Sequence, residues 1–134
     1  YLGRVFRAVY PNDGFDESLD AAALSRMMNN PADYKAEYVE TAFQIYERSA
    51  KLVAGSIAGL VLNLNSAYPS VKTVQVLAEG SLFWSKVKTN NAAYVDIVNA
   101  TLKELLAEAG IESTVAISRI ENANLIGAAM SVLS

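Results

Sequence analysis

The chain has 134 residues, a length typical of one domain, and 52% of them are apolar, which is enough for a substantial core. A net charge of −3, with eleven Lys and Arg residues that form no run, argues against a nucleic-acid-binding protein. The sequence contains neither Cys nor His, which excludes disulfides, Ser-His-Asp and Cys-His catalysis, and leaves none of the usual ligands for zinc.

The first half of the chain predicts three helices. Apolar residues recur at helical spacing within residues 1–10, and the Pro11–Gly14 segment breaks that pattern. A second, short helix is expected over residues 18–30, with Ser18 as its N-cap. The third and longest is expected over residues 35–65, where apolar residues alternate in steps of four and three: Val39, Phe43, Tyr46, Ala50, Val53, Ile57, Leu60 and Leu64.

The second half of this long helix is rich in small residues. An interior glycine costs a helix about 1 kcal/mol relative to Ala, so Gly55 and Gly59 predict the close approach of another backbone. That backbone belongs either to a packed sheet or to a second copy of the chain. The apolar run from Leu52 to Leu64 is 13 residues long, shorter than the roughly 20 that a membrane span needs. We therefore expect a buried helix and no membrane contact.

The second half of the chain predicts a βαβ unit. Residues 71–78 read as a strand with apolar residues on both faces, which indicates covering layers on each side. Asn90 and Asn91 offer caps for a helix that reaches Ala109, where Gly110 terminates it. Residues 114–120 form the second expected strand, and residues 122–133 the last helix. The two strands should be parallel, with a right-handed crossover.

Ligands of open α/β sheets bind beyond the carboxyl ends of the strands. The first expected strand ends in Glu79-Gly80-Ser81, where a glycine permits close approach of a ligand and a hydroxyl can bond to it. The second is followed, over residues 121–129, by a polar turn that enters the start of the last helix, where free N–H groups can face a ligand. On spacing alone, two ordinary loops are the better explanation of these turns. The acidic residues within 13–17 are interpreted as a solvated turn, so no metal ligands are assigned.

Four segments, in order along the chain, resemble the hexokinase family. Tyr1-Leu2-Gly3 with Arg7 is similar to the family's YLG-xxx-R stretch, and residues 48–58 to its R-x-A-x-L-x-A-x-x-I-A helix. Residues 76–83, VLAEGSLF, resemble an adenosine motif in which an apolar strand ends V-D-G-S/T-L-Y. Gly127-Ala128-Ala129 resembles the G-A-A that ends the family's last nucleotide-side loop.

This resemblance implies an α/β fold: a partial actin-like ATPase (ribonuclease H-like) lobe with a long helix and a parallel βαβ unit. Residues 1–134 would form a single domain, the C-terminal, nucleotide-side part of a hexokinase large domain. Gly80 and Ser81 would line the adenosine pocket, while Asn124, at the position of a family serine, and Gly127 would belong to the loop that closes over the base. The parent enzyme would use ATP with Mg²⁺ to phosphorylate a hexose such as glucose, in the cytoplasm.

The chain also departs from the family pattern. Ala123 and Leu125 stand where the family loop has glycines, Glu79 replaces the usual Asp, and Arg4 replaces a Glu. The family's phosphate loops, catalytic aspartate and sugar-contacting residues precede YLG, so no catalytic residue is assigned here. We expect an expressed fragment, since Tyr1 is not preceded by Met, that is inactive without the remainder of the kinase chain and that self-associates. The alternatives are a non-catalytic interaction or scaffold module with a degenerate nucleotide loop, and an unrelated α/β binding domain.

Overall fold

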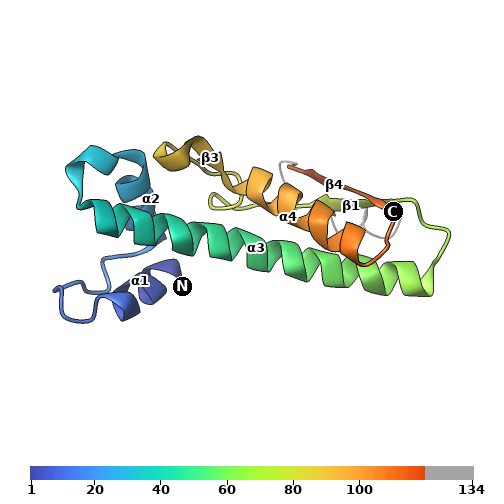
Figure 1. Ribbon diagram of the computed structural model, residues 1–134, viewed down its shortest axis with the longest axis horizontal. Helices are drawn as coiled ribbons and strands as arrows, with labels where there is room; N and C mark the ends of the chain where they lie inside the picture. The colour runs from blue at the N-terminus through green and yellow to red at the C-terminus, as the bar shows by residue number, and fades with distance from the viewer. Residues whose placement is uncertain (120–134) are drawn as a thin grey trace.

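The structure, a computed structural model, describes residues 1–119. A single long helix, α3, runs the length of the molecule (Figure 1). Two short helices pack on its first half, while α4 and a pair of strands lie along its second half. The elements are α1 (Leu2–Val9), α2 (Ala21–Asn29), the 3₁₀ turn η1 (Pro31–Asp33), α3 (Ala36–Ala67), β1 (Thr73–Leu77), β2 (Lys86–Val87), η2 (Thr89–Asn91), β3 (Ala92–Ala93), α4 (Tyr94–Glu108) and β4 (Thr114–Ser118).

The strands predicted at 71–78 and 114–120 are confirmed as a parallel pair. β1 and β4 run in register, with Val74 opposite Val115 and Val76 opposite Ile117. These four side chains join the core, whereas Thr73 and Gln75 on the other face are exposed. The expectation of a layer on each side is therefore wrong for residues 1–119, in which the helices cover one face only. The fold is mixed α/β with a long helix and a parallel βαβ unit, as predicted.

Helix α3 supplies the largest share of the core. It has 32 residues, which at 1.5 Å per residue gives a length of about 48 Å. Its most extensive packing is against α4. Three alanines at four-residue spacing, Ala50, Ala54 and Ala58, are buried, and their small size allows neighbouring elements to lie close. The predicted helix is thus confirmed, and the small residues in it are explained in part by this packing.

The outer face of α3 departs from the prediction. Leu60 and Leu64, expected in the buried stripe, are exposed by 64% and 40%. A Cβ built on Gly55 or Gly59 meets no atom within 4 Å, so no described backbone approaches either glycine. Only one face of the helix finds partners within residues 1–119. By length and composition alone α3 is apolar enough to cross a membrane, a weak criterion that core helices of soluble proteins also meet.

The start of α4 also differs from the prediction. Ala93 is its N-cap and provides no side-chain hydrogen bond. Asn90 and Asn91, expected as caps, instead have φ values of 56° and 47° in the turn between β2 and β3, which pair antiparallel. Asn tolerates this left-handed conformation better than most residues, so the pair serves the turn rather than the helix.

The end of α4 is as predicted. Gly110 has a φ of +71°, its N–H donates to the carbonyl of Ala107, and the N–H of Ile111 donates to the carbonyl of Leu106. This pair of bonds is a Schellman motif, in which the residue after the helix must be left-handed.

The short helix α1 packs backbone to backbone against the residues that precede α2. A Cβ on Gly3 would lie 2.0 Å from the carbonyl oxygen of Leu19, so only glycine fits there. The N-cap of α2 is Asp20, whose carboxylate accepts from the N–H of Ala23 at 2.9 Å. The prediction of Ser18 as the cap is wrong, because the Ser18 N–H and hydroxyl both donate to the carboxylate of Asp16.

Candidate functional site

The turn predicted to contact adenosine leaves the carboxyl end of β1. Ala78 still belongs to the strand pair, because its N–H donates to the carbonyl of Ser118 at 3.0 Å. Glu79, Gly80 and Ser81 follow, and all three are exposed. Gly80 has a φ of +114°, which side-chain-bearing residues rarely adopt, and a Cβ built on it meets nothing within 4 Å. The tip of the turn is therefore open to a ligand and depends on glycine.

The far end of this turn is anchored to both long helices. The hydroxyl of Tyr46 on α3 lies 2.9 Å from Oγ of Ser85 and donates to the Ser85 carbonyl at 3.1 Å. The N–H of Tyr94, the first residue of α4, donates to the same carbonyl at 3.0 Å. Burial raises the pKa of both tyrosine hydroxyls, of which that of Tyr46 bonds to Ser85 and that of Tyr94 to Ser49 on α3. The turn is thus fixed where it ends and exposed at its tip.

A third contact closes the base of the turn. The indole N–H of Trp84 donates to the carbonyl of Ala78 at 3.0 Å. The ring of Trp84 also meets that of Phe83 edge-on at 5.1 Å, and Phe83 in turn lies 5.8 Å from the ring of Tyr94. Sequence reasoning missed this contact. A signal existed, since a Trp that is partly buried usually finds an acceptor for its N–H, but the sequence alone does not say which one.

The second predicted turn, residues 121–129, and the helix predicted over residues 122–133 lie outside residues 1–119. Asn124 and Gly127 are outside residues 1–119. The register places Ser118, near the end of β4, opposite Leu77 at the end of β1. The two strands therefore end at the same edge of the sheet, as parallel pairing requires, which is the part of the predicted site that the structure brings together.

The chemistry available at this edge is limited. The tip of the turn offers backbone groups, the Glu79 carboxylate and the Ser81 hydroxyl, which can hydrogen-bond to a polar ligand such as a nucleoside. Among residues 1–119, no group of three acidic side chains is placed to hold a metal ion. No metal-dependent step is assigned to the described residues.

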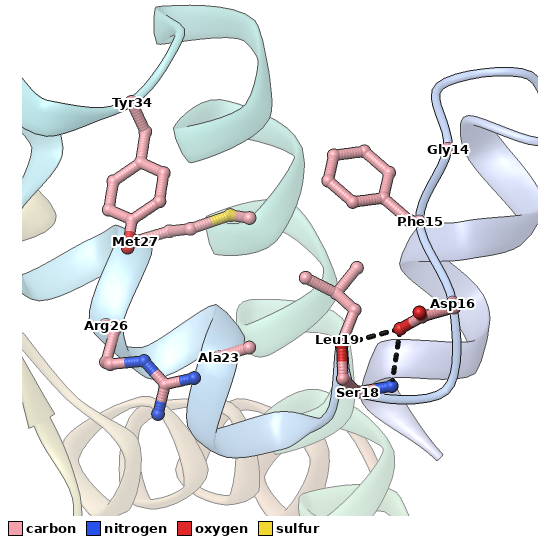
Figure 2. A pocket seen from close by; sticks show the side chains of 9 residues that line it. All are labelled: Gly14, Phe15, Asp16, Ser18, Leu19, Ala23, Arg26, Met27 and Tyr34. Atoms are coloured by element: carbon pink, nitrogen blue, oxygen red, sulfur yellow. Dashed lines mark hydrogen bonds between the residues drawn. The ribbon is translucent and has the colours of Figure 1, made fainter.

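A separate pocket lies at the other end of the molecule, between α2 and the loop that precedes it. Its volume is about 350 Å³. Figure 2 shows Phe15 and Leu19 on the loop side, with Arg26 and Met27 on α2 and Tyr34 beyond them. The carboxylate of Asp16 at its rim is engaged by Ser18, which lowers the pKa of Asp16. None of the residues of the strand-end turn lines this pocket, so it is not part of the predicted site.

Three of the four segments that carry the family resemblance lie in distinct elements, and the fourth, residues 127–129, lies outside residues 1–119. The YLG segment begins α1, the alanine-rich segment lies within α3, and the adenosine-like motif spans β1 and its turn. No curated protein and no solved structure matches the chain significantly. The sequence profile of the family described as hexokinase matches residues 6–134. Because that match covers nearly the whole chain, this protein belongs to the hexokinase family.

Proposed function

We propose that this chain is the C-terminal, nucleotide-side part of an ATP-dependent hexokinase and carries part of its adenosine site. One observation supports this most directly: in a member of the hexokinase family, an exposed Gly80-Ser81 turn leaves the carboxyl end of a parallel strand. Ligands of open α/β sheets bind at that edge. Gly80 and Ser81 would contact the adenosine, and Asn124 and Gly127 would close over the base from the second turn.

The remaining parts of the proposed activity lie outside this chain. Phosphoryl transfer needs a cradle for the phosphates, a carboxylate that holds Mg²⁺ and a base for the sugar hydroxyl. Among residues 1–119, no group of three acidic side chains is placed to hold a metal ion. We therefore propose that the upstream part of the kinase provides them, that a hexose such as glucose is the acceptor, and that the chain is inactive by itself. Family membership favours a soluble protein, and we propose the cytoplasm as its location.

Two assays test this proposal together. The isolated chain, given glucose and MgATP in a coupled assay, should show no turnover above background, because an adenosine contact alone stabilises no transition-state charge. The full-length gene product should phosphorylate a hexose and should lose affinity for ATP when Gly80 is replaced by Val. Turnover by the isolated chain would contradict the division of roles. A full-length protein that binds no ATP would contradict the adenosine site.

One observation favours a second candidate, a non-catalytic module with a degenerate nucleotide loop. Ala123 and Leu125 stand where the family loop has glycines, and their side chains restrict the backbone and crowd a base. The two candidates differ in a single measurement. Isothermal titration of the full-length protein with ATP gives binding for the kinase and none for the module.

A further inference from the structure

We propose that Trp84 is a positioning residue for the adenosine-side turn, holding it in the shape that receives the nucleotide. The inference rests on the proposed function. It starts from the 3.0 Å hydrogen bond that the Trp84 indole donates to the carbonyl of Ala78, across the base of the turn. Trp84 itself need not touch the ligand; it would act through the backbone of the residues it encloses.

The hydrogen bond completes the anchoring of Ala78. Its N–H is already held by the Ser118 carbonyl of β4, so the indole engages the one remaining backbone group of this residue. Ala78 is thereby fixed at the point where the chain leaves the sheet. Beyond it, Glu79, Gly80 and Ser81 are exposed and have no covering layer within residues 1–119. The direction in which the tip projects is set by its two ends.

The indole is itself held by the core. Its ring contacts Phe83 edge-on, and Phe83 lies against Tyr94, which is only 1% exposed at the start of α4. The adjacent Ser85 is bonded to Tyr46 of α3. Trp84 therefore connects a rigid junction of two helices to the exit of β1. Such a contact reduces the number of conformations that the tip samples before a ligand arrives.

Loss of the Trp84 hydrogen bond should weaken nucleotide binding, because the turn would then sample more conformations before the ligand arrives. A neutral hydrogen bond contributes a net free energy that corresponds to roughly a three- to tenfold change in an equilibrium constant. Removing the indole N–H should weaken nucleotide binding by about that factor. The KM for ATP should rise by a similar factor, while kcat and the KM for the hexose stay unchanged, because the turn contacts neither the transferred phosphate nor the sugar.

Two changes at Trp84 in the full-length protein test the inference. Trp84→Phe removes the N–H and part of the ring; the tryptophan isostere with sulfur in place of the indole N–H removes the donor alone. Thr89→Val is the matched control, because the Thr89 hydroxyl also donates one bond to a backbone carbonyl, that of Met28 at 2.7 Å, away from the turn. Titration calorimetry with ATP should show the loss of affinity for both Trp84 variants and none for Thr89→Val.

The outcomes separate the inference from the proposed function. If the wild-type protein binds ATP and both Trp84 variants bind it equally well, the inference is overturned and the proposed function stands. If the wild-type protein binds no ATP, the proposed function fails and the inference fails with it. Should a variant not fold, the wild-type indole N–H gives an independent reading by NMR. Slow exchange with solvent supports the bond to Ala78, and exchange at the rate of a free indole overturns it.

Discussion

Gly3 offers the sharpest test of how the N-terminal helix is held, through the substitution Gly3→Ala. A Cβ at this position would lie 2.0 Å from the carbonyl oxygen of Leu19 and 2.8 Å from Cα of Asp20. Ordinary van der Waals contact begins at about 3.4 Å. Since both opposing atoms belong to the backbone, neither can move aside as a flexible side chain would. Helix α1 must therefore withdraw from residues 19–20 by more than about 1 Å.

The change in the free energy of unfolding is the sum of opposing effects. Overpacking of a close contact costs about 1 to 3 kcal/mol or more, and a contact with rigid backbone belongs at the upper end. Withdrawal of α1 also exposes part of Leu2 and Phe6, which are 4% and 0% exposed. The better helix propensity of Ala returns about 1 kcal/mol. We expect a net loss of about 2 to 4 kcal/mol in the free energy of unfolding.

Urea denaturation of the purified chain, followed by circular dichroism at low protein concentration, measures this loss. Gly59→Ala is the matched control, because Gly59 also lies in a helix but has open space where the Cβ would be. That variant should gain up to about 1 kcal/mol from helix propensity. A glycine-to-alanine substitution is thus expected to lower the free energy of unfolding at residue 3 and to raise it at residue 59. A Gly3→Ala variant as stable as wild type would refute the backbone contact between α1 and residues 19–20.

Three further predictions concern capping, ionisation and association. Asp20→Ala should lower the free energy of unfolding by about 1 kcal/mol in a denaturant titration, and Ser18→Ala by clearly less, because only Asp20 caps α2. The Asp13 carboxylate accepts a hydrogen bond from the Tyr38 hydroxyl at 2.6 Å and raises the pKa of Tyr38 to about 12. The stability that this bond contributes is therefore fully present below pH 10.0 and is lost as the pH rises towards 12. An NMR titration of Asp13→Asn should find Tyr38 ionising nearer 10.0; an unchanged value would contradict this cause. Finally, the outer edges of β1 and β4, unpaired within residues 1–119, and the exposed leucines of α3 should make the isolated chain self-associate. A clean monomer in sedimentation at about tens of micromolar would count against that expectation.

Long elements with a clear period were predictable from the sequence. The helices that became α1, α3 and α4 show apolar residues at helical spacing, and both strands of the parallel pair are short runs rich in Val, Ile and Thr. The parallel pairing followed because a helix separates the strands. The position of Gly80 and Ser81 at the exit of β1 followed in turn from the ends of that strand. In each case the local sequence pattern is enough to predict the element, because the burial of one face requires apolar residues at that spacing.

Features that depend on particular contacts were not predictable. Strands β2 and β3 have two residues each, too short to show any period. The apolar stripe of α3 continues through Leu60 and Leu64 although no described element covers them, since a pattern does not state which part of a surface finds a partner. Ser18, predicted as the cap of α2, instead donates to the Asp16 carboxylate, and Asp20 caps the helix. The Trp84 bond likewise depends on the path of the turn in three dimensions.

The parallel pairing of β1 with β4 has a consequence for the order of events in folding. Residues 78–113 lie between the two strands, so they cannot close progressively from a tight turn as a hairpin does. Helices form within about a microsecond, whereas pairing across such a separation must first pay the entropy of closing a long loop. Docking of α4 along α3 shortens that loop by bringing the start of β4 back to β1. We therefore expect the sheet edge at which Gly80 and Ser81 project to form last, after α4 has docked on α3.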